Sequence, residues 1–219
     1  MSTMMDLFKV TGICPIMAKM SPDSAVPAAK ALIEGGVPVV EVLMWDEDSM
    51  GNLENIAREL PGITVGAGTV LNVHQAERLI DLGAQFIVMP GFNPKIVELC
   101  LEKDIPVLPG CVTATEIMMA LSYGIQVVKF FPVYQMGGIE MLKQLNGGPF
   151  PHVRFVATGG LNSENFLPLM RYPNILAAGG DWMFADHQAL ANKDYQQITR
   201  NLRKSVNDVL DIRAAAAVQ

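Results

Sequence analysis

Two side chains in this sequence bring the chemistry of an acid and an amine into stretches that are otherwise apolar. Glu41 lies within the run Val37–Met44, and Lys129 lies within Val127–Pro132. A carboxylate in an apolar strand costs free energy unless it is paired or takes part in a reaction. Apolar surroundings disfavour the ammonium form of an amine and so leave a neutral nucleophile. A nucleophilic lysine with a nearby carboxylate can condense with a ketone to a Schiff base while the carboxylate moves protons.

Both residues also have a purely structural interpretation. Glu41 can be a buried acid that is tied to a neighbouring lysine. Lys129 and Glu41 can form an ion pair that only stabilises the fold. The sequence leaves these alternatives open.

Glycine-rich turns follow three of the apolar runs. Gly159-Gly160 comes after Thr158, Gly179-Gly180 precedes Asp181, and Gly66–Thr69 supplies backbone amides with one hydroxyl. Backbone N–H groups in such turns, together with the N-terminus of a following helix, can surround a phosphate. A barrel turn also uses glycine, and Thr69 can simply cap a helix.

The elements that must position these residues alternate regularly along the chain. The expected strands are 12–18, 37–44, 63–66, 85–89, 106–108, 125–130, 153–157 and 175–178. The expected helices are 22–34, 49–60, 72–82, 94–103, 114–123, 138–145, 163–171 and 188–212. Strands that are apolar on both faces and are joined through helices indicate a parallel sheet. Eight such units predict a (β/α)8 TIM barrel of the α/β class, with a doubly wound open sheet as the alternative.

No linker, repeat or change of composition divides the sequence, so residues 1–219 are expected to form a single barrel domain. A short helix at Thr3–Lys9 is expected to plug the bottom of this barrel. In such barrels the reacting groups lie at the carboxyl ends of the strands, where Glu41 and Lys129 are expected.

Composition excludes several classes of partner. The net charge is −6 and no block of basic residues occurs, which argues against nucleic acid. Half of the residues are hydrophobic, yet no uncharged apolar run reaches the ~18 residues that a membrane span needs. Three cysteines and three distant histidines predict neither a disulfide framework nor a metal site. With no signal peptide in evidence, reduced thiols predict a cytoplasmic protein.

A set of short motifs resembles the 2-keto-3-deoxy-6-phosphogluconate / 4-hydroxy-2-oxoglutarate aldolase family. The motifs occur in the family's order, and they read Val40–Val42, Gly66–Leu71, Pro109-Gly110, Val128–Pro132, Gly137-Gly138 and Thr158–Gly160. The resemblance implies a trimeric, metal-free and cofactor-free class I aldolase. It implies that Lys129 forms the Schiff base with pyruvate and that Glu41 is the general acid and base.

The resemblance also implies a set of substrate-binding residues. Thr69 and the Met89-Pro90-Gly91 turn would line the pyruvate pocket, and Gly159, Gly160, Gly179 and Gly180 would receive a phosphate. The apolar composition and the 14 methionines agree with the implied homotrimer, since they offer apolar surface beyond the needs of one barrel.

Three positions depart from the family's pattern. Trp45 stands where the family usually has the arginine of an EVTLR-like segment, which helps to hold the substrate carboxylate. Lys19 is the available substitute for another basic residue after the first strand. Asp181 stands where the family tends to have serine, and its charge would repel a phosphate.

The sequence therefore predicts retro-aldol cleavage of a 4-hydroxy-2-oxo acid to pyruvate and an aldehyde. Decarboxylation of a 2-oxo acid on the same lysine is one alternative, and a catalytically weak binding homologue is another. Trp45 and Asp181 predict poor cleavage of the phosphorylated sugar acid and a preference for a substrate with an uncharged distal end.

Overall fold

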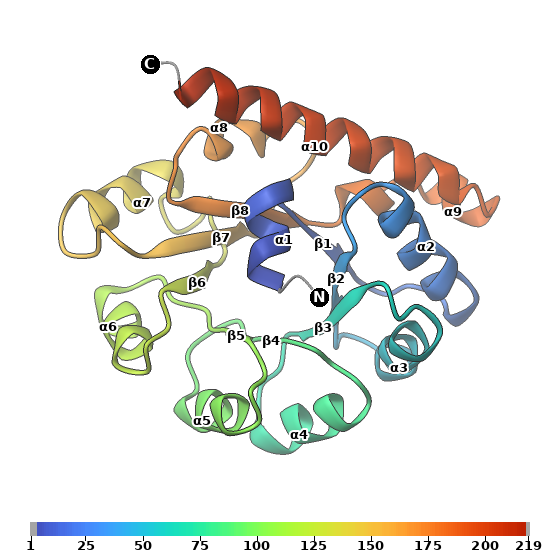
Figure 1. Cartoon of the computed structure of the whole chain (residues 1–219), viewed down its shortest axis with the longest axis horizontal. Coiled ribbons are helices and arrows are strands. Elements are labelled where there is room, and N and C mark those ends of the chain that lie inside the picture. The colour runs from blue at the N-terminus through green and yellow to red at the C-terminus, as the bar shows by residue number, and fades with distance from the viewer. Residues whose placement is uncertain (1–3, 218–219) are drawn as a thin grey trace.

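The computed structural model describes residues 4–217. Within them, eight parallel strands alternate with helices and form a nearly closed barrel, as predicted (Figure 1). The strands are β1 (Ile13–Met17), β2 (Val39–Leu43), β3 (Thr64–Gly68), β4 (Ile87–Val88), β5 (Val107–Leu108), β6 (Val127–Phe130), β7 (Arg154–Thr158) and β8 (Ile175–Gly180). This arrangement is a (β/α)8 TIM barrel, and it excludes the open sheet.

Strand pairing runs around the barrel in the order β5-β4-β3-β2-β1-β8-β7-β6. The remaining junction, between β5 and β6, is closed by a single parallel bridge between Gly110 and Lys129. The Lys129 amide donates to the Pro109 carbonyl at 2.8 Å, and the Cys111 amide donates to the Lys129 carbonyl at 2.9 Å. The lysine of interest therefore also completes the barrel through its backbone.

Helices form the outer ring that Figure 1 shows around the strands. The helices of this ring are α2 (Pro22–Glu34), α3 (Ser49–Glu59), α4 (Val73–Asp81), α5 (Pro94–Glu102), α6 (Ala114–Ser122), α7 (Gly138–Gly147), α8 (Leu167–Met170), α9 (His187–Ala191) and α10 (Tyr195–Ala217). One more helix, α1 (Met4–Thr11), lies inside the ring in this view. A 3-10 turn, Trp182–Phe184, follows β8. Side-chain caps stabilise the first turns of two of these helices. At α4 the Asn72 side chain accepts a hydrogen bond from the Gln75 amide, and at α6 Thr113 and Glu116 form a capping box.

Helix α1 lies across the end of the barrel that faces the viewer in Figure 1, where the strands begin. Its Met4 and Phe8 side chains are buried against the core. The expected helix began at Thr3, which lies outside the described residues, and the observed helix continues past Lys9 to Thr11.

Two segments differ from the sequence-based expectation. The helix expected over 163–171 is reduced to α8, because Asn162 and Asn165 bond the backbone of residues 160–165 into a turn. The helix expected over 188–212 is two helices. Lys193 has a φ of 58°, a left-handed conformation that breaks the helix before Tyr195.

No helix between residues 4 and 217 combines the length and the apolar character that a bilayer span requires. Cys14, Cys100 and Cys111 are free and buried.

Candidate active site

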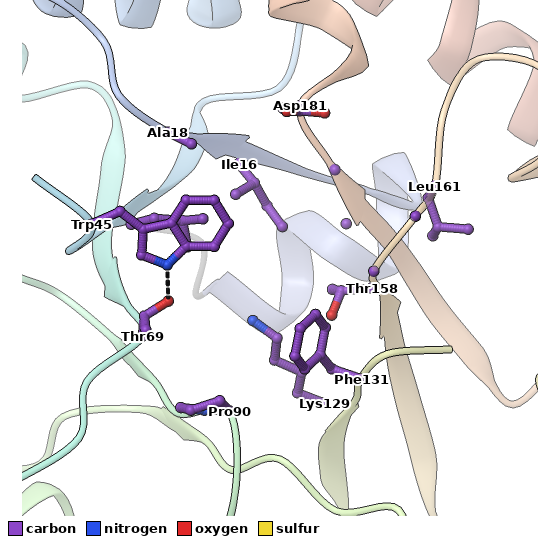
Figure 2. A pocket seen from close by; sticks show the side chains of 15 residues that line it. Ile16, Ala18, Trp45, Thr69, Pro90, Lys129, Phe131, Thr158, Leu161 and Asp181 are labelled. Atoms are coloured by element: carbon purple, nitrogen blue, oxygen red, sulfur yellow. Dashed lines mark hydrogen bonds between the residues drawn. The ribbon is translucent and has the colours of Figure 1, made fainter. Parts of the chain in front are cut away.

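A cavity of about 210 Å³ opens at the carboxyl ends of the strands, where a barrel of this kind places its reacting groups. Every strand except β5 contributes lining residues, either from its last positions or from the loop that follows. Those residues are Ile16, Ala18, Leu43, Trp45, Thr69, Pro90, Lys129, Phe131, Thr158, Gly159, Gly160, Leu161, Gly179, Gly180 and Asp181. Figure 2 shows this pocket from close by.

The amine and the acid that the sequence singled out meet beneath this cavity. Lys129 Nζ lies 3.1 Å from Glu41 Oε1, and their side chains are 7% and 0% exposed, respectively. The strands β2 and β6 carry them, so residues 88 positions apart in the sequence are brought into contact. Lys129 lines the cavity, whereas Glu41 lies behind it.

Glu41 has a second neighbour, on β1. The Cys14 thiol donates to Glu41 Oε2 at 3.8 Å. Burial, and then the negative charge of Glu41, raises the pKa of the Cys14 thiol well above its ordinary value. Cys14 therefore stays a neutral thiol, and the two oxygens of Glu41 each face one donor.

Space for the Glu41 carboxylate depends on a glycine in β3. A Cβ at Gly68 would collide with Glu41 Oε1 and with the Leu43 side chain. The Gly66–Thr69 turn therefore does more than expose amides: it leaves room for the buried acid.

Thr69 is held in an unusual conformation directly after β3. Its φ is 61°, a left-handed value that a β-branched residue rarely adopts. Its Oγ1 accepts a hydrogen bond of 3.0 Å from Trp45 Nε1, as Figure 2 shows. Trp45 is 54% exposed and lines the cavity.

Two further lining residues lie beside the lysine, and sequence reasoning had assigned a role to neither. Phe131 places its ring centroid 5.5 Å from Lys129 Nζ (Figure 2). Thr158, the last residue of β7, is 2% exposed, and its Oγ1 has no hydrogen-bond partner among the described residues. An unpaired buried hydroxyl costs about 1–3 kcal/mol, and a molecule bound in the cavity can supply the missing partner.

The glycine pairs line the cavity from the loop after β7 and the end of β8, whereas Trp45 lines it from the loop after β2. Gly159 and Gly160 have φ values of 96° and 71°, conformations that favour glycine. Gly179 and Gly180, expected after β8, are instead its last two residues, because β8 pairs with β1 through Cys14↔Gly179 and Pro15↔Gly180.

Two charged candidates have different positions relative to the cavity. Asp181 is exposed and contributes to the lining directly after β8. Lys19 is exposed, with a φ of 50°, and does not belong to the lining. Its part in binding a substrate carboxylate stays a prediction. Pro90 lines the cavity after β4, and its neighbours Met89 and Gly91 do not.

Within residues 4–217, no three His, Cys, Asp or Glu side chains gather in a way that could hold a metal ion. The polar groups of the cavity are instead one amine, the carboxylate behind it, two threonine hydroxyls, one indole N–H and one exposed carboxylate. This set suits covalent chemistry on a carbonyl group through the amine.

Comparisons with known proteins give one consistent result. The family model described as KDPG and KHG aldolase matches residues 4–201. The 2-dehydro-3-deoxy-phosphogluconate aldolase of Treponema pallidum is 40% identical over 91% of this chain and 94% of its own length. The KHG/KDPG aldolase of Escherichia coli K12 is 38% identical over 89% of this chain and 90% of its own.

Solved structures of KDPG aldolases also resemble this chain. A KDPG aldolase from Legionella pneumophila, with pyruvate captured at low pH as a covalent carbinolamine intermediate, superposes with a TM-score of 0.85 at 32% identity. The match covers 92% of this chain and 97% of that one.

Proposed function

Because the chain belongs to the KDPG and KHG aldolase family, we propose that it is a class I aldolase. It cleaves a 2-keto-3-deoxy-6-phosphogluconate-like or other 4-hydroxy-2-oxo acid to pyruvate and an aldehyde. Lys129 is the nucleophile and Glu41 is the general acid and base. The observation that carries this proposal is the contact of 3.1 Å between Lys129 Nζ and Glu41 Oε1 below a cavity at the carboxyl ends of the strands.

The same contact explains how a neutral amine can arise. A nucleophilic lysine must first lose a proton, and Glu41 Oε1 is within direct transfer distance of Lys129 Nζ. The pair is nearly free of solvent, so the proton passes between these two groups rather than to bulk water. Once Lys129 has reacted, Glu41 keeps Cys14 as a donor to its other oxygen.

Cleavage then proceeds by imine formation, breakage of the C3–C4 bond and hydrolysis. Lys129 Nζ adds to the C2 carbonyl of the substrate, and the carbinolamine loses water to give an iminium ion. Glu41 accepts the proton of the C4 hydroxyl, directly or through water, while the C3–C4 bond breaks and its electrons move into the iminium. The aldehyde leaves. Glu41 gives the proton that it accepted from the C4 hydroxyl to C3 of the enamine, and water hydrolyses the resulting imine to pyruvate and free Lys129. Each positioned proton transfer contributes about 10²–10⁴-fold to the rate.

The other lining residues fit around this reaction. Thr69 and Pro90 contact the pyruvate half, and the unpaired hydroxyl of Thr158 bonds a substrate oxygen near Lys129. Gly159, Gly160, Gly179 and Gly180 surround the far end of the substrate with backbone amides. Lys19 does not line the cavity, so its side chain must extend into the cavity to contact a substrate carboxylate.

Charge at the edge of the cavity supports a narrower substrate class. Lys129 is the single basic side chain among the lining residues, and its nitrogen is bonded to C2 of the substrate during the reaction, so no cationic side chain of the lining remains for the distal end. Asp181 adds a carboxylate beside the glycine pairs, and Asp46, Glu47 and Asp48 follow Trp45 on the exposed loop after β2. We therefore propose that the distal end of the substrate is uncharged, with hydroxyl groups that donate to Asp181 and C–H faces that pack on Trp45.

Two measurements test the proposal in order. Pyruvate with borohydride should add a stable reduced adduct at Lys129, located by peptide mass spectrometry, and an unmodified Lys129 would overturn the aldolase assignment. Purified protein should then release pyruvate together with an aldehyde from 4-hydroxy-2-oxo acids. Release of carbon dioxide from an oxaloacetate-like acid without aldehyde formation would instead assign a decarboxylase.

We also propose a homotrimer of single-domain subunits in the cytoplasm. Exposed apolar side chains on α5 and α6, namely Leu101, Met118, Met119 and Leu121, support contact with another subunit. The free, buried cysteines support a reducing compartment. Light scattering tests the trimer, and a monomeric mass at working concentration would contradict it.

A further inference from the structure

A second cavity, of about 380 Å³, lies at the opposite end of the barrel from the proposed active site. Four basic side chains line it: Lys9, Arg154, Arg171 and Arg213. They come from the end of α1, the start of β7, the residue after α8 and the last turns of α10. Figure 1 shows these elements gathered around the starts of β7 and β8. The remaining lining residues are apolar.

These positive charges are not neutralised by the residues that the structure describes. No acidic side chain belongs to the described lining, and none of the ion pairs within residues 4–217 involves these four residues. Asp208, on the same helix as Arg213, is already paired with Lys204 at 2.7 Å. Like charges that converge on one cavity raise the free energy of the folded state unless an anion joins them.

Arg213 is fixed in place at this cavity. Its Nη1 donates to the Lys9 carbonyl at 3.0 Å, and its Nη2 donates to the Leu176 carbonyl at 2.7 Å. Burial, and then the positive charge of Arg154, lowers the pKa of Arg213 below its usual range. A guanidinium that is already fixed by two carbonyl groups loses little conformational freedom when an anion arrives.

We propose that this cavity binds a phosphate group, either free phosphate or the monoester of a small organic molecule. Arginine side chains match the oxygens of a phosphate with paired N–H donors, and a dianion neutralises two of the facing charges. The cavity exceeds the size of one phosphate, and its apolar residues can cover the organic part of an ester. This site does not depend on the proposed aldolase activity.

Calorimetric titration with inorganic phosphate, and separately with glucose 6-phosphate, tests the site at constant ionic strength and pH. The variant is R154Q/R171Q, because both side chains are exposed and neither forms a side-chain hydrogen bond or ion pair with the residues that the structure describes. The matched control is R78Q, which removes an exposed charge on α4 away from the cavity. The double variant should bind phosphate at least about tenfold more weakly than wild type, while R78Q should bind as wild type does.

The two probes also identify the source of the phosphate group. Tighter binding of glucose 6-phosphate than of phosphate assigns the apolar part of the cavity to an organic ester. Equal affinities for glucose 6-phosphate and inorganic phosphate identify free phosphate as the ligand of this cavity. Absence of binding to wild type, or equal affinity in wild type and R154Q/R171Q, overturns the proposal, since the second result would show that phosphate binds without Arg154 and Arg171.

Thermal unfolding supplies an independent measurement. A ligand that binds only the folded state raises the midpoint with its concentration. Phosphate should therefore raise the Tm of wild type and R78Q above that in chloride of equal ionic strength, and it should not do so for R154Q/R171Q. If the double variant does not fold, R154Q and R171Q are measured singly, each against R78Q. A phosphate-induced rise in Tm that is the same in all proteins overturns the proposal.

Discussion

The floor and the edge of the active-site cavity are built in different ways. The floor, which we define as Lys129, Glu41 and Cys14, comes from strand interiors and is almost completely buried. The edge, which we define as Trp45, Phe131 and Asp181, comes from residues that follow strands, and its side chains are exposed. Barrel pairing fixes the floor, whereas loops can change the edge without disturbing the core. The proposed function therefore assigns bond breaking to the rigid part of the site and substrate selection to the variable part.

Removal of the lysine gives the largest expected effect. Lys129→Ala should lower kcat by about 10⁴-fold or more, the scale of losing a catalytic nucleophile, and should abolish borohydride trapping of pyruvate. It also leaves the Glu41 carboxylate buried without its cation, which costs about 3–5 kcal/mol of stability. Activity must therefore be measured at a temperature where circular dichroism shows a folded protein. Substantial turnover by this variant would show that the floor is only an ion pair.

Replacement of the acid tests the other half of the floor. Glu41→Gln keeps the shape of the side chain but removes its capacity to accept a proton. The variant should still be trapped with pyruvate, and its kcat for cleavage should fall by about 10²–10⁴-fold. A kcat equal to that of wild type would make Glu41 a structural residue.

Substitutions at the edge should change which substrates are cleaved and should leave imine formation at Lys129 unchanged. Asp181→Asn should raise kcat/KM for the 6-phosphorylated sugar acid by about tenfold, because it removes a carboxylate beside the glycines that would receive the phosphate of that substrate. Pyruvate trapping at Lys129 should stay unchanged. Asp23→Asn is the matched control, since it removes an exposed acid near the same end of the barrel without touching the cavity.

Trp45→Arg combined with Asp181→Ser sharpens the same test. On the phosphorylated substrate, this double variant should have a higher kcat/KM than Asp181→Asn. If wild type already cleaves the phosphorylated acid with a kcat/KM of about 10⁴ M⁻¹s⁻¹ or more, and better than its unphosphorylated analogue, the proposed selection is wrong.

The smallest effect is expected outside both regions, at the capping box of α6. Burial alone would raise the pKa of Glu116, but hydrogen bonds from the Val112 and Thr113 amides and the Thr113 hydroxyl outweigh it, so the pKa is lowered. The stabilisation is therefore present above the unfolded pKa of about 4.3 and is lost as the pH falls through the lower folded value. Glu116→Gln should cost about 0.5–1 kcal/mol at pH 7 in urea unfolding, with a smaller difference below pH 4. A pH-independent difference would contradict this assignment.

Sequence patterns predicted the parts of the molecule that follow from local rules. The alternation of apolar runs and helices predicted the barrel, and the barrel placed Glu41 and Lys129 at one end. The patterns did not predict contacts that depend on three-dimensional packing. Cys14 looked like an ordinary buried thiol, and its bond to Glu41 arises only because β1 pairs with β2.

Loop conformation was equally hard to predict from sequence. Trp45 and Thr69 are joined by a hydrogen bond only because Thr69 adopts a left-handed backbone. Lys19 was a reasonable candidate by charge and position, but its loop leaves it outside the lining. The basic cavity combines residues from four separate segments, so no local motif marks it.

The bridge that closes the barrel between β5 and β6 contains two backbone amides whose hydrogen exchange reports whether the barrel is closed. Hydrogen exchange at the Lys129 and Cys111 amides reports opening of that junction, because both amides bond across it. We expect a local opening there to move Lys129, the proposed nucleophile, away from Glu41 while the other strand pairs persist. Loss of imine formation should therefore accompany exchange at these two amides, and both should precede global unfolding.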